Sequence, residues 1–511
     1  MVSIDAETAV THVCCIGAGY VGGPTSAVMA SKCPTVQFTV VDIDARRIAA
    51  WNSNKLPVYE PGLDEIVRSQ RGENLRFSTD INEGIRTADI VMIAVNTPPV
   101  QCERGLGAAA DLRRVEECAL QIAKAAQRNT IVVEKSTVPC RTGELIADIL
   151  GKHGSPGVKF SVLSNPEFLS EGTAVRDLLH PDRVIIGGLP GSENAQSALQ
   201  SIYSQWIPSE RIVTMGLWSA ELTKLASNAL LAQRVSSINS ISAVCEAVGA
   251  SVSEVAHGCG LDSRIGDKFL RASIGFGGSC FHKDIASLVW LSASLGLHDV
   301  AEYWDQVLKM NDSQMLRFVQ RVVQGVDGGI AGVDIAILGF AYKGGTGDTR
   351  NTPAAFVCKQ LLECGANLSI FDPKVRNEHT RHDLGLAVTL SETPGILQQK
   401  QQLPVKLQQM CLRNLQMSQL QPYVNHKVLV AMNDGRVVVG TLRGLDQTTN
   451  IIMQGCEERI YSEDEGVEVV PLGLYLIRGD NIAVIGLVDE ALDNGLDLDE
   501  TRGQPLEPIK H

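Results

Sequence analysis

The feature that most constrains the fold is a glycine-rich turn, Gly17-Ala18-Gly19-Tyr20-Val21-Gly22, which directly follows a short apolar run. In a strand-turn-helix unit of this kind the first glycine permits a tight turn. The second lets a pyrophosphate approach the backbone, and the third lets the helix pack closely on the strand. The N–H groups at the start of the helix then face the phosphates. We therefore expect residues 17–22 to bind a dinucleotide.

An acidic residue at the end of the next strand narrows the choice of dinucleotide. Asp42 lies 25 residues after Gly17, where a carboxylate accepts hydrogen bonds from a ribose and favours NAD over NADP. Arg47 leaves alternatives open, because a nearby arginine can accommodate a 2′-phosphate, contact the phosphates of NAD or lie in solvent. A glycine-rich turn in an ordinary α/β domain is the other interpretation, although strand, turn, helix and acid occur here in the expected order.

The hydropathy pattern predicts an α/β chain with a doubly wound, Rossmann-type parallel sheet. From residue 10 to about residue 163, short apolar runs alternate with helical stretches, as in a parallel sheet with crossover helices. The expected strands are 13–17, 38–41, 90–95, 131–134 and 160–163. Residues 216–325 carry long helical patterns instead, at 219–247 and 283–294. They predict a helical middle domain.

A second α/β pattern follows and ends early. Strands are expected at 334–338 and 367–371, with a helix after Thr352 between them. A sheet of about two strands has open edges and little buried apolar surface. Residues 398–416 then contain 7 glutamines in 19 positions, a composition typical of a linker or a solvated helix. From residue 424 onward, short apolar runs and the Asp434-Gly435 pair predict a hairpin in a small all-β domain.

These patterns divide the chain into five parts, and its composition excludes several protein classes. The predicted parts are an NAD-binding Rossmann domain at 1–215, a helical central domain at 216–325, a partial second Rossmann domain at 326–395, a Gln-rich linker at 396–418 and an all-β barrel at 419–511. With 44% apolar residues in 511, the chain is neither a mini-protein nor disordered. Its longest apolar runs fall far short of the roughly 18 residues that cross a bilayer, and we expect an intracellular protein without membrane contact.

Charge and cysteine usage add to this picture. Residues 419–511 hold 7 Lys+Arg and 16 Asp+Glu, which is −9 of the total −13. Such an asymmetry suggests parts with different functions. The 13 cysteines contain no CxxC pair and fit a reducing compartment, and the sequence indicates no metal site.

One cysteine lies in an unusual loop, Phe276-Gly277-Gly278-Ser279-Cys280-Phe281-His282-Lys283-Asp284. The glycines permit close approach of a ligand, and Lys283 together with a helix N-terminus would favour the thiolate. Cys280 is therefore a candidate nucleophile, and from the local sequence alone a buried structural thiol is about equally plausible. Cys14 and Cys15, inside the first strand, are expected to be buried structural thiols.

Other polar residues lie where ligands bind in open α/β sheets. Lys224 and Asn228 are four residues apart in a predicted helix, so an amine and an amide share one face and can approach one reacting oxygen. Glu167 and Thr137 each follow the end of an expected strand. A solvated lysine and a cap-like asparagine are the alternative interpretation of the helical pair.

Long strings through residues 10–375 resemble the UDP-glucose 6-dehydrogenase family. They include GAGYVGGPT, WNSNKLPVYEPGL, VNTPP, EKSTVP, SNPEFLSEGTA, PDRVIIGG, ELTKLASNALLAQR, RIGDKFLRASIGFGGSCFHKD and LGFAYK. The resemblance implies a cytosolic, homo-oligomeric oxidoreductase of nucleotide-sugar metabolism. Such an enzyme oxidises UDP-glucose to UDP-glucuronate with two NAD⁺ through a cysteine thiohemiacetal and thioester.

The resemblance also implies residue roles. The catalytic positions would be Cys280, Lys224, Asp284, Glu167, Asn228 and Thr137. The cofactor positions would be Gly17, Gly19, Tyr20, Val21, Gly22, Asp42, Arg47, Thr97, Thr137, Glu171, Lys283 and Arg350. The substrate positions would be Glu167, Phe168, Leu169, Glu171, Lys224, Asn228, Arg264, Arg271, Phe276, Gly277 and Lys343. The chain departs from the family at Gly344-Gly345, where a Lys-Asp pair is usual. It departs again where the last domain ends roughly a hundred residues early.

Residues 423–488 resemble an Sm-fold domain, and LGLYLIRGDNIAVIGLVDE resembles the like-Sm proteins of the U6-RNA-associated ring. The resemblance implies that Asp446, Asn450 and Arg478 line a ring pore and contact uridine-rich RNA. It also implies like-Sm ring subunits as partners in nuclear mRNA splicing. The charge of −9 in this segment argues against non-specific nucleic-acid binding.

Two hypotheses follow for the whole chain. The first is an NAD-dependent dehydrogenase with an appended RNA-binding module. The alternative is an RNA-ring subunit, acting in mRNA splicing, that carries a truncated and inactive dehydrogenase. Counted from Met417, the remaining 95 residues have about the length of a free like-Sm protein. We therefore hypothesise that the sequence is a fusion of two neighbouring genes, by read-through or by an error in the gene model.

Overall fold

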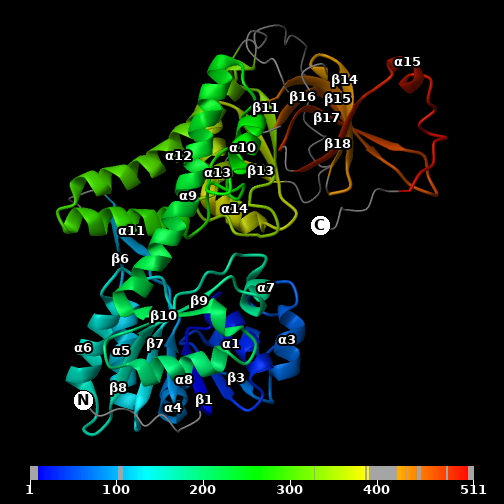
Figure 1. The fold of residues 1–511 in the computed structure, drawn as a ribbon. Helices are drawn as coiled ribbons and strands as arrows, with labels where there is room; N and C mark the ends of the chain where they lie inside the picture. The colour runs from blue at the N-terminus through cyan, green and yellow to red at the C-terminus, as the bar shows by residue number, and fades with distance from the viewer. Residues whose placement is uncertain are drawn as a thin grey trace. The chain divides into compact units, whose positions relative to one another are not determined.

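The computed structural model describes residues 10–101, 107–326, 329–385, 388–390, 423–432, 434–445, 450–478 and 481–504. The chain forms two compact units, one of Met1–Leu230 and Lys283–Asp305, the other of Leu231–His282 and Gln306–His511 (Figure 1). The predicted glutamine-rich linker lies outside the described residues, and the five domain boundaries stay predictions. Among the described helices, none has both the length and the apolarity to span a membrane.

The first unit is built on an eight-stranded sheet in the order β10-β9-β8-β7-β4-β1-β2-β3. Its strands are β1 (His12–Ile16), β2 (Gln37–Val41), β3 (Leu75–Ser78), β4 (Ile90–Ile93), β7 (Thr130–Glu134), β8 (Phe160–Ser164), β9 (Val184–Gly188) and β10 (Ile212–Gly216). Neighbours pair in parallel except β8 with β9. The order from β3 to β8 is that of doubly wound dinucleotide-binding sheets, in which ligands bind where the strand order reverses, here between β1 and β4. The predicted fold class is confirmed.

Helices cover both faces of this sheet because its strands are apolar on both faces. Alternate residues of β1 enter different cores: Val13 and Cys15 join one cluster, and Cys14 and Ile16 join the other. The helices and short elements of the unit are α1 (Gly22–Lys32), α2 (Ala45–Trp51), α3 (Leu63–Gln70), α4 (Ile81–Thr87), α5 (Arg113–Ala125), α6 (Thr142–His153), α7 (Ala174–Leu179), α8 (Glu193–Tyr203), η1 (Ser209–Arg211), α11 (Phe281–Ser294) and the hairpin β5 (Pro99–Gln101) and β6 (Ala108–Ala110).

The long helices and the second α/β region agree with the predicted pattern. Helix α9 (Leu217–Val248) runs through the first expected helical stretch, and α10 (Val252–Gly260) and α12 (His298–Gln324) follow it in the chain. The second unit then forms β11 (Asp334–Leu338), α13 (Pro353–Glu363), β12 (Asn367–Phe371), α14 (Asn377–Leu384) and the short strand β13 (Thr389–Leu390). Thr352 caps α13 by accepting a hydrogen bond from the Ala354 N–H, which confirms a helix starting after Thr352.

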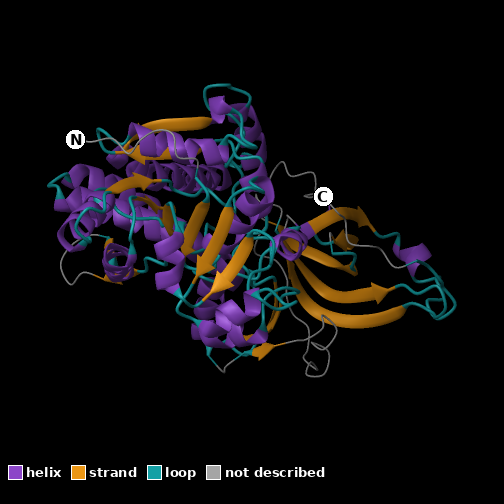
Figure 2. Cartoon of the chain, turned by 90° about the horizontal axis from the view of Figure 1, so that it is seen from below, coloured by secondary structure: helices purple, strands orange, loops and turns teal. Residues whose placement is uncertain are grey.

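The C-terminal β-segment contains β14 (Lys427–Met432), β15 (Val437–Leu445), β16 (Ile451–Ile460), β17 (Glu468–Ile477), β18 (Ile482–Leu487) and the short helix α15 (Glu490–Asp493). Its strands curve strongly, as the orange arrows at the right of Figure 2 show. Strands β14 and β15 pair in antiparallel fashion on either side of the Asp434-Gly435 turn, where Gly435 has φ of 90°. The predicted hairpin is confirmed.

One expectation about the second α/β region is wrong. The sequence predicts about two strands with open edges, but the described sheet has eight strands in the order β13-β12-β11-β17-β16-β15-β14-β18. Strand β13 adds a third parallel strand beside β12, and β17 pairs with the other edge of β11. The hydropathy pattern missed this pairing because it joins strands separated by about 140 residues.

Candidate active site

The glycine-rich turn has the shape that a dinucleotide site requires. Gly17 has φ of +110° and its N–H donates to the Val41 carbonyl at 2.7 Å. A Cβ on Gly22 would lie 2.0 Å from the Gly17 carbonyl oxygen, whereas a Cβ on Gly19 would have no atom of the described residues within 4 Å. No side chain caps the start of α1; the Gly23 N–H donates to the Gly19 carbonyl at 3.2 Å, and Pro24 has no N–H. The turn thus fits the pyrophosphate of NAD.

Asp42 is held beside this turn at the end of β2. Its Oδ2 accepts hydrogen bonds from the Ala18 N–H at 2.9 Å and from Arg47 Nη1 at 3.0 Å, and its Oδ1 accepts one from the Asp44 N–H at 2.9 Å. The carboxylate is buried and fixed by backbone donors, as a ribose-binding acid must be. Arg47 pairs with this carboxylate and is therefore directed at the site.

A buried glutamate, Glu60, ties the turn to the loop that follows β8, and sequence reasoning missed it. Its carboxylate accepts hydrogen bonds from the Tyr20 hydroxyl, from the Gly172 N–H at 2.6 Å and from the Ala174 N–H at 2.9 Å. Because these partners lie 40 to 114 residues away, the only local signal was an acid between a tyrosine and a Pro-Gly pair. Glu60 fixes the loop containing Glu171 relative to the dinucleotide turn.

Four of the predicted catalytic side chains form one buried polar cluster in the first unit. Lys224 Nζ lies 3.4 Å from Glu167 Oε1, and Asn228 Nδ2 donates to Asp284 Oδ2 at 2.6 Å. Lys224, Asn228 and Asp284 are 4%, 7% and 1% exposed. Lys224 and Asn228 lie one turn apart on α9, Glu167 follows β8, and Asp284 lies in the first turn of α11. Charged groups this deeply buried require partners, and each has one here.

Lys283 joins the cluster to the predicted cofactor residues. Its Nζ lies 3.7 Å from Asp284 Oδ1 and donates to Thr97 Oγ1 at 3.4 Å, while the Thr97 hydroxyl donates to the Thr137 carbonyl at 2.7 Å. Burial raises the pKa of Asp284, and the ammonium groups of Lys283 and Lys224 oppose that rise. The cluster therefore places a carboxyl that holds its proton more tightly than usual beside two cations.

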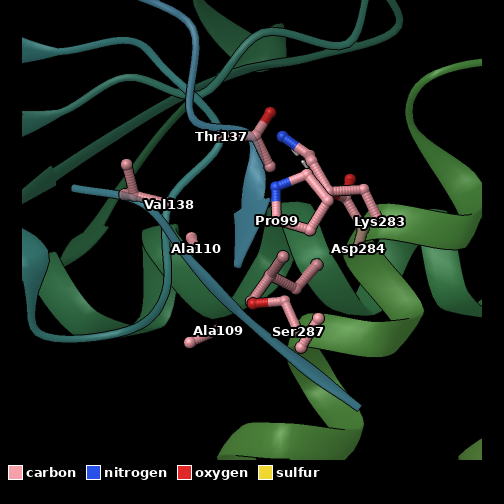
Figure 3. Close-up of a pocket in the computed structure, with 10 residues that line it drawn as sticks. Pro99, Ala109, Ala110, Thr137, Val138, Lys283, Asp284 and Ser287 are labelled. Carbon is pink, nitrogen blue, oxygen red and sulfur yellow. Dashed lines mark ion pairs between the residues drawn. The ribbon is translucent and has the colours of Figure 1, made fainter. Parts of the chain in front are cut away.

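A small pocket opens beside this cluster, and Figure 3 shows Thr137 and Lys283 at one end of it and Ser287 and Ala109 at the other. Its lining residues are Pro99, Ala108, Ala109, Ala110, Thr137, Val138, Leu225, Lys283, Asp284 and Ser287. Thr137, Lys283 and Asp284 place polar groups at one end, and apart from Ser287 the rest of the wall is apolar, which is the usual character of a ligand pocket.

The loop after β8 is held by cation–π contacts. The Arg183 guanidinium lies 3.9 Å from the centre of the Phe168 ring, and Lys224 Nζ lies 5.2 Å from it. The Leu169 N–H donates to Glu167 Oε2 at 2.7 Å, which orients the carboxylate toward Lys224. Sequence reasoning singled out Glu167, Phe168 and Leu169 but not Arg183.

Cys280 is exposed and immediately precedes α11. Its Sγ lies 3.6 Å from Ser279 Oγ. Cys14 and Cys15 are buried, as predicted, and burial raises the pKa of the Cys15 thiol to about 11. The Cys280 thiol, whose burial the local sequence left open, is accessible at the start of a helix, whereas the two strand thiols are buried as predicted.

The glycine loop before Cys280 packs on a segment that follows β11. The Gly278 N–H donates to the Arg350 carbonyl at 2.9 Å, and a Cβ on Gly277 would lie 2.4 Å from the Asn351 carbonyl oxygen. Phe276 is buried, with its N–H bonded to Asn311 Oδ1 at 2.8 Å. Only glycine permits this approach. The second unit thus contains a contact between two segments that lie about 70 residues apart in the sequence.

The remaining predicted cations lie in the second unit: Arg264, Arg271 and Lys343 from the substrate set, and Arg350 from the cofactor set. The Arg264 guanidinium forms an ion pair with Asp262, with Nη2 2.6 Å from Oδ2. Arg350 pairs with Asp348 in the same way, with Nη2 2.7 Å from Oδ2. Arg271 is exposed, and Lys343 Nζ lies 5.6 Å from the centre of the Tyr342 ring. A diphosphate would have to compete with Asp262 for Arg264, because a guanidinium fork engages one such partner at a time.

Two of the three predicted RNA-contact residues lie together in the β-segment. Asn450 precedes β16 and Arg478 follows β17, and the adjacent residues Ile451 and Ile477 are register partners. Both side chains therefore start from the same end of one strand pair. Asp446 lies outside the described residues.

Because Glu134, at the end of β7, is buried, we expect the stability of the fold to depend on pH. Burial and the nearby Glu221 raise its pKa well above the ordinary value of 4.5, and its Oε1 has no hydrogen-bond partner among the described residues. The folded chain then binds a proton that the unfolded chain has released, so stability falls as pH rises above about 4.5. Glu134→Gln removes this loss. We expect the free energy of unfolding of Glu134→Gln, relative to that of the unsubstituted chain, to increase between pH 5 and 8 by up to about 1.4 kcal/mol per pH unit.

Denaturant unfolding at several pH values measures this difference. Glu117→Gln, at an exposed position on α5, is the control. Its free energy of unfolding should change with pH in the same way as that of the unsubstituted chain. If the free energy of unfolding of Glu134→Gln also followed the pH dependence of the unsubstituted chain, the prediction would be contradicted.

Comparison with protein families finds the UDP-glucose/GDP-mannose dehydrogenase family in three successive parts. Its NAD binding domain matches residues 11–207, its central domain residues 218–313 and its UDP binding domain residues 336–439. An LSM domain matches residues 418–487, so the last two matches overlap at 418–439.

Named relatives and solved structures agree with these matches. UDP-glucose 6-dehydrogenase 3 of Arabidopsis thaliana is 58% identical over 73% of this chain and 78% of its own length. UDP-glucose 6-dehydrogenase of Drosophila melanogaster is 58% identical over 73% and 79%. The UDP-glucose dehydrogenase structure from Pyrobaculum islandicum has a TM-score of 0.69 and 34% identity over 78% of this chain and 89% of its own. The matches favour a dehydrogenase over an RNA-ring subunit, and the chain belongs to the UDP-glucose/GDP-mannose dehydrogenase family and carries an LSM domain.

Proposed function

We propose that the chain oxidises C6 of UDP-glucose to the carboxylate of UDP-glucuronate. The observation that carries the proposal is the buried cluster of Lys224, Asn228, Asp284 and Glu167. It occurs in a chain 58% identical to proteins named UDP-glucose 6-dehydrogenase. Bound NAD⁺ supplies the hydride acceptor, once for each of two oxidations. The turn at Gly17–Gly22 and the Asp42 carboxylate would hold it.

Cys280 would act as the nucleophile between the two oxidations. The first oxidation removes a hydride from C6 and the proton of its hydroxyl, which leaves an aldehyde. The Cys280 thiolate adds to the aldehyde carbon and the oxygen takes a proton, giving a thiohemiacetal. Loss of that proton and a second hydride gives a thioester, and water then cleaves the C–S bond to release the carboxylate and the thiol. The covalent step divides one difficult oxidation into two easier ones.

The buried cluster would manage protons and charge at the reacting oxygen. The Lys224 ammonium and the Asn228 amide are donors that would stabilise an oxygen as it becomes negative. Asp284, whose pKa burial raises, would exchange a proton with the substrate oxygen through this pair. Glu167 and Thr137 would orient the hydrolytic water.

Substrate recognition would use both main-chain and cationic groups. Gly277, which is partly exposed, has no side chain to block the approach of a nucleotide to the backbone. Arg264, Arg271 and Lys343 would neutralise the diphosphate. Of these, Arg264 would exchange its present partner Asp262 for the substrate.

The test is purified full-length chain with UDP-glucose and NAD⁺. We expect two NADH for each UDP-glucuronate and no free aldehyde. GDP-mannose, at equal concentration, is the control for the family's other named sugar nucleotide and should give at least tenfold less NADH. No NADH above background, or oxidation of GDP-mannose alone, would refute the proposed substrate.

We also propose a cytosolic homo-oligomer. Helix α9 presents exposed apolar side chains at spacings of three to eleven residues, Leu230, Ile241, Val244 and Val248, and such a stripe is typical of a helix that packs on a partner. Light scattering of the purified chain would give its mass in solution, and a monomer at micromolar concentration would exclude the oligomer.

A second candidate function is favoured by the position of Asn450 and Arg478 at one end of the β16–β17 pair. We propose that this end contacts uridine-rich RNA, with the guanidinium stacking on a base and the amide reading its edge. Other like-Sm subunits would be the partners. Binding of a uridine oligonucleotide that is lost in Asn450→Ala would support this role, and equal binding of oligo(A) would refute it.

A further inference from the structure

We infer that the LSM domain is the structural partner of the shortened UDP-binding domain, and that β17 takes the place of that domain's fourth strand. The described sheet runs β13-β12-β11-β17. In doubly wound sheets the order is 3-2-1-4, with the fourth strand parallel to the first and on the side away from the second. Strands β11 and β17 lie side by side and parallel, with Ala336 opposite Tyr475 (Figure 1).

The packing of β11 supports this inference. Its residues alternate between two cores: Ile335 and Ile337 face the cluster that contains α13, while Ala336 and Leu338 pack in the core of the LSM domain. A strand that is apolar on both faces must be covered on both. Helices cover one face of β11, and the LSM domain covers the other.

Strand β17 is shared in the same way. Tyr475 is 1% exposed and lies in the LSM core, whereas its neighbour Leu476 packs against the cluster around β11 and β12. Successive residues of one strand therefore contribute to two cores, which is expected only of a strand inside a continuous sheet.

Polar contacts join the same two parts. Arg321 on α12 donates to the Leu445 carbonyl at 3.3 Å. The Arg436 guanidinium donates to the Tyr475 hydroxyl at 3.0 Å and lies 5.7 Å from the centre of the Phe371 ring at the end of β12. Arg436 thereby links the LSM hairpin, β17 and the UDP-binding strands, close to the point where β17 pairs with β11 at Tyr475.

The first experiment measures amide hydrogen exchange in the full-length chain. Leu476→Asp puts a charge into the shared face, and we expect exchange at residues 334–338 to rise at least tenfold while residues 428–431 of β14 stay protected. Val469→Asp, an equal substitution at an exposed position on the same strand, is the matched control and should change neither segment. Unchanged exchange in β11 with Leu476→Asp would overturn the inference.

A second experiment covers the case in which Leu476→Asp unfolds the LSM domain, which loss of protection in β14 would reveal. A Gly/Ser insert with a specific protease site is placed after Gln402 in the full-length chain, and the chain is cut. We expect the two pieces to elute together on size exclusion, because the β11–β17 contact holds them. If the two pieces of the cut, otherwise unsubstituted chain elute separately, the inference is overturned whatever Leu476→Asp shows.

Discussion

Cys280→Ser should lower UDP-glucuronate formation by at least about 10⁴-fold, the scale of loss when a nucleophile is removed. A serine hydroxyl is almost fully protonated at neutral pH, whereas a thiol at the start of a helix gives thiolate readily. Without the thioester the second oxidation has no activated intermediate. NAD⁺ and UDP-glucose should still bind within about twofold of the unsubstituted chain, because the substitution replaces one small exposed side chain. Product chromatography and binding titrations measure the two effects.

Cys259→Ser is the matched control for this prediction. Cys259 is also exposed, but it lies on α10, away in sequence from the glycine loop. Its activity should stay within about twofold of the unsubstituted chain. If Cys280→Ser still made UDP-glucuronate at more than a hundredth of the normal rate, Cys280 would not be the nucleophile.

Gly22→Ala should prevent stable folding of the dinucleotide-binding sheet, while Gly19→Ala should spare the fold and weaken NAD binding. A Cβ at residue 22 would lie 2.0 Å from the Gly17 carbonyl oxygen and 2.9 Å from Cys15 Sγ. The clash is with backbone at the turn itself, so we expect a loss of about 3 kcal/mol or more. A Cβ at residue 19 would have no atom of the described residues within 4 Å, so stability should change by less than about 0.5 kcal/mol.

The two variants distinguish an effect on folding, expected at Gly22, from an effect on NAD binding, expected at Gly19. The methyl group of Gly19→Ala would occupy the space into which the pyrophosphate approaches, and NAD affinity should fall at least tenfold, about 1.4 kcal/mol. Thermal unfolding without ligand and an NAD titration measure the pair. Unchanged NAD affinity in Gly19→Ala would show that the open space at Gly19 is not a ligand site, and equal losses of melting temperature in both variants would contradict the predicted difference in stability.

The local parts of the site could be predicted from the sequence because their signals are local. The Gly17–Gly22 turn, Asp42 at the end of β2, and Lys224 with Asn228 on one face of α9 each follow from the spacing of a few residues. Thr352 as a helix cap and the Asp434-Gly435 hairpin belong to the same class. Apart from Asp42, which lies 25 residues after Gly17, the residues that determine each feature lie within a few positions of each other.

The tertiary parts could not be predicted, because their partners are distant in the chain. Glu60 is buried only because Tyr20, Gly172 and Ala174 converge on it. Arg183 contributes to the site through the face of one aromatic ring. No periodicity or motif reports such contacts. The pairing of β17 with β11 joins two segments whose patterns each describe a separate domain, so the sequence suggested open edges where the sheet continues.

That pairing has a consequence for assembly. A free barrel of this kind offers a strand edge on each side, and subunits that join edge to edge into a closed array need both. Here β11 pairs with the β17 edge at Tyr475, while Val484 and Leu487 on β18 remain 62% and 53% exposed. If like-Sm subunits add to this chain edge to edge, we expect them to join through β18 and not where β11 pairs with β17, so the chain would end a row of subunits rather than link two of them.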